Sequence, residues 1–321
     1  MEFAEYIRKF DAHTAKYIPD RADWTPSDHA VYGPSNYFRL DPQEANDLRY
    51  KVVRYQLNRH FQSNRTYRTY CEELKFDPES IRSADDLDKV PVVSTDFFKT
   101  YPTGRDFALW LANVYTGELP KIHIKSKEPT HDEVIKSFND AGMAVSYSSG
   151  TSGRHTFIPR DRKAFFANEY ALSKGALTMF YPRWGPDMRS FLLMPNPFKT
   201  NLFAGRLGTV MYDIMKDVEV ALDREVNTET VRQSMVKGDS IVGKITKYVV
   251  SRTTQRSIDR IVDWIGERSK DGSRIALVGV PFMLHYVLNE LKERGKSYDI
   301  GDRTMILTGG GGNGTFRYQM N

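Results

Sequence analysis

The chain has 321 residues, 40% of them apolar and 27% charged, as in a globular protein built from one large domain or two lobes. Its net charge of +5 comes without any run of Lys and Arg interleaved with aromatics, so we expect no nucleic-acid partner. The single cysteine, Cys71, excludes an internal disulfide and a cysteine metal cluster, and we expect its side chain to be buried. An acidic N-terminus and the lack of about 18 consecutive apolar residues favour a cytoplasmic protein without a membrane span.

The first region, residues 1–140, is predicted to be mostly helical and polar. Asp41 and Pro42 are typical of a helix start, and apolar residues near helical spacing extend this helix to about Phe61. Further short helices are expected at 67–74, 77–81, 84–87 and 97–99, the last of them capped by Ser94 or Thr95.

The second region, residues 141–321, alternates predicted strands and helices, which favours an α/β fold. Two helices carry apolar stripes that we expect to be buried against the sheet. Strands are expected at 145–147, 156–158, 191–194, 218–222, 274–280 and 303–308, and helices at 163–180, 256–268 and after Pro281. The two stripes are Ile258, Ile261, Val262 and Ile265, and Leu284, Val287, Leu288 and Leu291.

A loop of small and hydroxyl residues, Tyr147 to Gly153, joins the first two of these strands. Gly150 and Gly153 allow backbone angles that aim successive N–H groups at one point, and Arg154 adds positive charge. Such a loop suits a polyphosphate, and the alternative is a flexible Ser/Gly hairpin. It is neither the Gly-Lys-Ser/Thr loop nor the Rossmann glycine pattern, so a kinase or GTPase is disfavoured.

Four glycines, Gly309 to Gly312, follow the last predicted strand. The end of a strand in an α/β sheet is a usual place for backbone that binds a ligand. The alternative is that this run is a disordered tail.

Three separated segments resemble the adenylate-forming enzymes. Ser148–Gly153 resembles their phosphate loop, usually Ser-Ser-Gly-Thr-Thr-Gly, and Val278–Pro281 is similar to their strand–Gly-Val-Pro–helix unit. Leu307–Gly311 looks like the strand and glycine turn against which adenine lies. A fourth segment, Tyr67–Lys99, resembles phenylacetate–CoA ligase and, more closely, the LuxE-type acyl-protein synthetases.

The resemblance implies a fold and a reaction. The fold would be the large N-terminal α/β domain of these enzymes, with mixed sheets flanked by helices, a helical N-terminal region and no small C-terminal lobe. The reaction would use ATP and Mg²⁺ to convert a carboxylic acid to an acyl-adenylate. The acyl group would then pass to CoA, a carrier protein, a protein cysteine or an amine. The chain would act as a homo-oligomer or in complex with a partner enzyme.

The resemblance also implies site residues, although no catalytic residue and no protein metal ligand can be carried over. Thr151 would additionally help to place Mg²⁺. The implied ATP-binding residues are Ser148, Ser149, Gly150, Thr151, Ser152, Gly153, Arg154, Gly309, Gly310, Gly311 and Gly312. The implied acid-binding residues are Pro195, Asn196, Pro197, Phe198 and Phe203.

The sequence departs from the family pattern in five respects. Arg154 and His155 stand where Pro-Lys often follows the loop, and nothing after Gly312 resembles Tyr-Gly-x-Thr-Glu. The ribose-binding aspartate and the lobe with the catalytic lysine have no counterpart, nor does the acyl-accepting cysteine near the C-terminus. We therefore expect an N-terminal portion that is inactive or weak alone, or a non-catalytic scaffold that retains the fold.

Overall fold

The computed structural model describes residues 1–150, 154–230, 241–302 and 304–309, with the backbone alone for 241–251. The chain forms two compact units. The sheet unit comprises Met1–Tyr6, Tyr147–His155 and Met179–Asn321, and the helical unit comprises Ile7–Ser146 and Thr156–Thr178. Within the described ranges, no helix combines the length and apolar character needed to cross a bilayer.

Several helices of the helical unit begin at conventional capping residues. Asp41 accepts hydrogen bonds from the N–H groups of Gln43 and Glu44 at the start of the long helix α3, which confirms the predicted start. Thr25 and Asp28 form a capping box at α2. The helices are α1 (Phe3–Thr14), α2 (Pro26–Tyr32), α3 (Pro42–Ser63), α4 (Arg65–Glu73), α5 (Gly104–Val114), α6 (His131–Asp140) and α7 (Arg162–Met179).

Short 3₁₀ turns connect these helices at Pro78–Ser80, Ala84–Lys89 and Phe97–Lys99, near the predicted positions. The predicted cap of the last turn is wrong, because Asp96 occupies the cap and no side chain closes it. Cys71 in α4 is fully buried, as expected. Two strands, β1 (Met143–Tyr147) and β2 (Phe157–Asp161), pair with each other on either side of the Ser/Gly loop.

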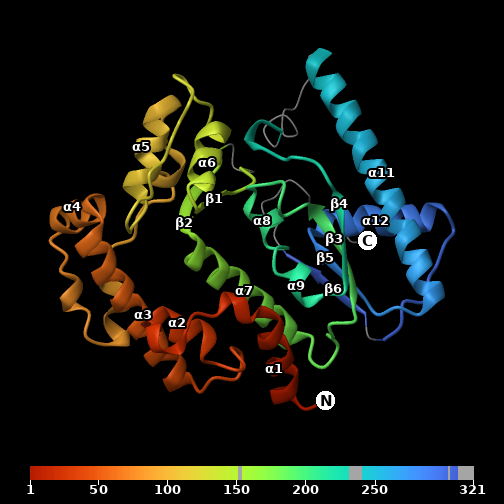
Figure 1. The fold of residues 1–321 in the computed structure, drawn as a ribbon, viewed down its shortest axis with the longest axis horizontal. Coiled ribbons are helices and arrows are strands. Elements are labelled where there is room, and N and C mark those ends of the chain that lie inside the picture. Colours follow the sequence, from red (N-terminus) through yellow and green to blue (C-terminus); the bar gives the residue numbers. More distant parts are fainter. Residues whose placement is uncertain (151–153, 231–240, 303, 310–321) are drawn as a thin grey trace. The chain divides into compact units, whose positions relative to one another are not determined.

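The sheet unit contains a four-stranded sheet in the order β4-β3-β5-β6 (Figure 1). Every described pairing in this sheet is parallel, so all four carboxyl ends lie at one edge. This confirms the predicted α/β class. The strands are β3 (Arg189–Pro195), β4 (Asp217–Leu222), β5 (Ile275–Gly279) and β6 (Met305–Thr308).

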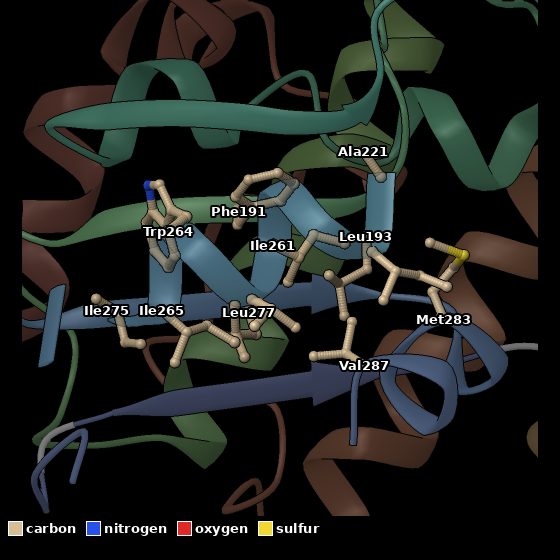
Figure 2. Close-up of a cluster of buried hydrophobic side chains, with 12 residues drawn as sticks. Phe191, Leu193, Ala221, Ile261, Trp264, Ile265, Ile275, Leu277, Met283 and Val287 are labelled. Carbon is tan, nitrogen blue, oxygen red and sulfur yellow. The ribbon is translucent and has the colours of Figure 1, made fainter. Parts of the chain in front are cut away.

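Helices α11 (Ile241–Asp271) and α12 (Pro281–Glu293) cover one face of the sheet. Figure 2 shows Ile261, Trp264 and Ile265 of α11 among the side chains of β3 and β5. The opposite face carries Leu192 and is covered by the segment with α8 (Phe203–Arg206) and α9 (Met211–Ile214). A Cβ at Gly208 in this segment would lie 2.6 Å from the Leu192 side chain, so glycine permits this close packing.

The predicted α11 stripe is confirmed, because Ile258, Ile261, Val262 and Ile265 are all buried. The α12 stripe is confirmed only in part. Val287 is 1% exposed, but Leu288 is 55% exposed and was wrongly expected in the core. Met283 takes the buried position instead, because the contact with the sheet follows one narrow face of this helix.

Candidate functional site

The order of the strands creates a switch point between β3 and β5. The connection from β3 to β4 runs through α8 and α9 on one face, whereas the connection from β5 to β6 runs through α12 on the other. At such a point the two neighbouring connections leave the sheet in opposite directions. In α/β sheets, ligands bind in the crevice outside the carboxyl ends of strands at this position.

Tyr147 anchors the start of the Ser/Gly loop at this edge. Its N–H donates to the Asn201 carbonyl at 3.0 Å, and Tyr147 pairs with Leu202 in a parallel bridge. Its hydroxyl donates to the Val226 carbonyl at 3.2 Å, and its side chain is 1% exposed. Asn201 follows β3 and Val226 follows β4, so the loop begins beside the carboxyl ends of both strands.

Gly150 and His155 pack against each other in the part of the loop that the structure describes. Gly150 has a φ of +72°, in the left-handed region that favours glycine. The His155 Nδ1 atom lies 2.8 Å from the Ser148 carbonyl and donates to it, because a carbonyl can only accept. The imidazole also makes an edge contact with Tyr147, with ring centroids 5.2 Å apart. A Cβ at Gly150 would lie 2.9 Å from His155 Nδ1, so both conformation and space require glycine.

The other predicted loop residues differ in exposure. Ser148 and Ser149 are half-buried, and Arg154 is exposed. Thr151, Ser152 and Gly153 lie outside the described residues, as do Gly310, Gly311 and Gly312.

Asn196 joins the ends of β3 and β4. Its N–H donates to the Leu222 carbonyl at 2.9 Å, and its Nδ2 donates to Asp223 Oδ1 at 2.7 Å. Lys199 Nζ lies 2.9 Å from the same carboxylate oxygen. The hydrogen bonds from Lys199 and Asn196 hold the pKa of Asp223 below its ordinary value, so the carboxylate is ionised at neutral pH.

The remaining predicted acid-binding residues lie along the same segment. Pro195 is half-buried at the end of β3, Pro197 is buried, and Phe203 is half-buried at the first position of α8. Phe198 is 65% exposed and makes an edge contact with Tyr212, with ring centroids 5.0 Å apart. Phe198 is therefore a surface residue of this edge.

Gly279 and Gly309 lie together at the ends of β5 and β6. The N–H of Gly309 donates to the Gly279 carbonyl at 3.1 Å and extends the pairing of these strands by one residue. A Cβ at Gly279 would lie 2.7 Å from both Cβ and O of Leu193, so only glycine fits this close approach. A Cβ at Gly309 would meet no atom of the described residues within 4 Å.

The described candidate residues thus share one unit and one sheet edge. Three residues of this edge, Lys199, Asn201 and Asp223, were missed by sequence reasoning. Their only sequence signal is that they follow predicted strands, and their contacts join segments that are far apart in the chain. Within the described ranges, no three His, Cys, Asp or Glu side chains converge as metal ligands.

The family comparison concerns the helical unit. Residues 26–105 match the family model described as Acyl-protein synthetase, LuxE. The match spans α2 to the start of α5 and contains Tyr67–Lys99, the segment that had indicated this family. The predicted LuxE-type resemblance is therefore confirmed over residues 26–105, and the wider adenylate-forming assignment stays a prediction. No curated protein and no solved structure matches the chain.

Proposed function

We propose that the protein is an acyl-protein synthetase-like ligase that activates a carboxylic acid with ATP and passes the acyl group to a thiol or amine. The single observation that carries this proposal is the anchoring of the Ser/Gly loop by Tyr147 to Asn201 at the carboxyl edge of a parallel sheet. The LuxE match over 26–105 independently supports acyl transfer as the class of reaction.

The loop would bind the phosphates of ATP. Gly150 turns the chain in the left-handed region, and such turns direct backbone N–H groups toward an anion. The hydroxyls of Ser148, Ser149, Thr151 and Ser152 would add donors, and the exposed Arg154 would add positive charge. These groups would offset the charge that grows on the departing pyrophosphate when the carboxylate attacks the α-phosphate.

The ends of β3 and β6 would hold the other reactants. The backbone of Gly309 would contact the flat face of adenine, and Gly310, Gly311 and Gly312 are further candidates for this role by the family resemblance. Pro195 to Phe198, with Phe203, would contact the apolar part of the acid.

Mg²⁺ would reduce the repulsion between the attacking carboxylate and the phosphates. Protein Mg²⁺ sites for nucleotides commonly use the phosphates and water with one or two side-chain oxygens. Thr151 is our candidate for one side-chain oxygen, and the remaining residues act in binding and orienting ATP and the acid.

The test is pyrophosphate exchange driven by a panel of carboxylic acids. In the full-length protein, the double change Ser149→Ala and Thr151→Ala should reduce acid-dependent exchange at least about 100-fold, because two donors to the developing charge are lost. Ser63→Ala, an exposed serine at the end of α3, is the matched control and should leave exchange unchanged. Exchange that survives the double change would refute the assignment of this loop.

The alternative of a non-catalytic scaffold makes a different prediction in the same assay. Such a module would bind a fluorescent ATP analogue but exchange no pyrophosphate with any acid. The proposed ligase requires both binding of the ATP analogue and acid-dependent pyrophosphate exchange in the full-length protein.

A further inference from the structure

A basic segment, residues 121–127, joins α5 to α6 in the helical unit (Figure 1). Its exposure alternates with a period of two. Lys121, His123, Lys125 and Lys127 are exposed, whereas Ile122, Ile124 and Ser126 are half-buried. This alternation is typical of extended chain, in which alternate side chains share a face and stand about 7 Å apart. The segment therefore presents a row of positive charge along one face.

Arg105 of α5 holds one edge of the basic segment. Its guanidinium donates to the carbonyls of Ile124 at 3.3 Å, Ser126 at 2.9 Å and Lys127 at 3.3 Å. Three hydrogen bonds from one planar group fix the backbone of the segment against α5. The segment is thus set in an extended form within the fold.

The other edge of the basic segment has no partner in the part of the chain that the structure describes. Residues 124 and 126 turn their carbonyls to Arg105, so in the extended chain residues 123 and 125 turn their N–H and C=O groups to the opposite side. The carbonyl of Lys127 also faces Arg105, so this alternation ends at residue 126 and the free backbone edge lies at residues 123 and 125. No backbone or side-chain hydrogen bond to these groups exists among the described residues. An unpaired row of this kind is a template for a further strand.

The charges of the basic segment are also unpaired among the described residues. Neither Lys121, Lys125 nor Lys127 forms an ion pair there, and acidic residues occur only at the flanks, as Glu118 and Glu128. An added strand with acidic side chains at alternate positions would place each of them opposite a lysine.

We propose that residues 121–127 form a docking edge that accepts an extended, acidic segment of a partner protein as an added β-strand. Backbone pairing would supply affinity, and the alternating lysines would select alternating acids. The free edge favours a peptide over a nucleic acid, because phosphates can accept from its N–H groups but cannot donate to its carbonyls. A membrane surface is disfavoured, because the apolar Ile122 and Ile124 lie on the half-buried side.

The probe is a fluorescein-labelled peptide of about eleven residues in which Glu and Thr alternate. Its N-terminus is acetylated and its C-terminus is amidated. Fluorescence anisotropy with the full chain at low salt should show saturable binding that weakens as salt rises. The same peptide with N-methyl groups on every backbone nitrogen keeps the charge but has no backbone N–H left to donate from either edge. We expect the methylated peptide to bind at least about tenfold more weakly.

Two variants at one position separate charge from backbone pairing. Lys125→Ala removes one charge and should weaken binding about threefold. Lys125→Pro removes the same charge and also the free N–H of residue 125, and should weaken binding at least about fivefold further. Proline is compatible with the extended backbone here, and circular dichroism of both variants checks that the fold is retained.

Several results would overturn the proposal. Absence of saturable binding to the Glu/Thr peptide would exclude this partner chemistry. Equal affinities of Lys125→Pro and Lys125→Ala, or of the methylated and unmethylated peptides, would show that no strand is added. Inorganic polyphosphate is the third comparison. If it binds more tightly than the peptide and its affinity is unchanged by Lys125→Pro, the segment is a simple anion site.

Discussion

Replacement of Gly150 by alanine probes the geometry of the Ser/Gly loop most sharply. An L residue at a φ of +72° costs about 1 kcal/mol. The new Cβ would also lie 2.9 Å from His155 Nδ1 and 3.1 Å from its Cε1, and overpacking of this kind costs about 1–3 kcal/mol. We expect Gly150→Ala to lower the free energy of unfolding of the sheet unit by about 2–4 kcal/mol.

Gly301 provides a matched control. It has the same φ of +72°, but a Cβ there would meet no atom of the described residues within 4 Å. Gly301→Ala therefore carries the conformational cost alone and should destabilise by about 1 kcal/mol.

A double-mutant cycle separates the contact with the imidazole from the backbone cost. In a His155→Ala background the contact with the imidazole disappears and only the approach to the Arg154 backbone carbon at 3.3 Å remains, so the cost of Gly150→Ala should fall toward the value of about 1 kcal/mol expected at Gly301. The assay is denaturant unfolding followed by Trp184 and Trp264, both in the sheet unit, with Trp24 and Trp110 changed to phenylalanine in every variant. Equal costs at positions 150 and 301 with His155 present, or no relief without it, would refute the described loop geometry.

Two further predictions concern the two cores. Val287→Ala should lower the free energy of unfolding by about 2 kcal/mol, because truncation of a buried side chain leaves a cavity. The neighbouring Leu288→Ala should change this free energy by less than about 0.5 kcal/mol, because Leu288 is largely exposed. Similar values for the two variants in denaturant unfolding would contradict the orientation of α12. Burial lowers the pKa of the Lys174 ammonium despite the opposing effect of Asp11. Between this lowered pKa and the unfolded-state value of about 10.4, the folded protein has lost the proton and the unfolded chain still binds it. Stability conferred through this group therefore rises with pH across that window. Lys174→Met should abolish this rise, so that the difference in free energy of unfolding between variant and parent changes from about pH 7 to 10.5. A difference that stays constant over this range would contradict the prediction.

Local signals in the sequence account for much of the fold. Asp41 and Pro42 mark the start of α3 because capping needs only neighbouring residues. The α11 stripe is recovered because four apolar residues at helical spacing all face one sheet. The same reasoning wrongly predicts that Leu288 is buried, because the width of the helix face that the sheet covers depends on packing and not on the helix alone.

The candidate site is predictable only in its motifs. The Ser/Gly loop and the glycine run at 309 are visible in the sequence because glycine and hydroxyl residues serve a local backbone purpose. The contacts of Tyr147 with Asn201 and Val226, and of Lys199 and Asn196 with Asp223, join segments separated by many residues. Such pairs follow from the order of the strands, which no local pattern contains.

The most direct test of the central claim is hydrogen–deuterium exchange of the full-length protein with and without ATP and Mg²⁺. The claim that backbone N–H groups of the Ser/Gly loop bind phosphate predicts protection of peptides covering 147–156, accompanied by protection around Gly309. Protection confined to peptides from residues 7–140, with unchanged exchange at 147–156, would contradict the account.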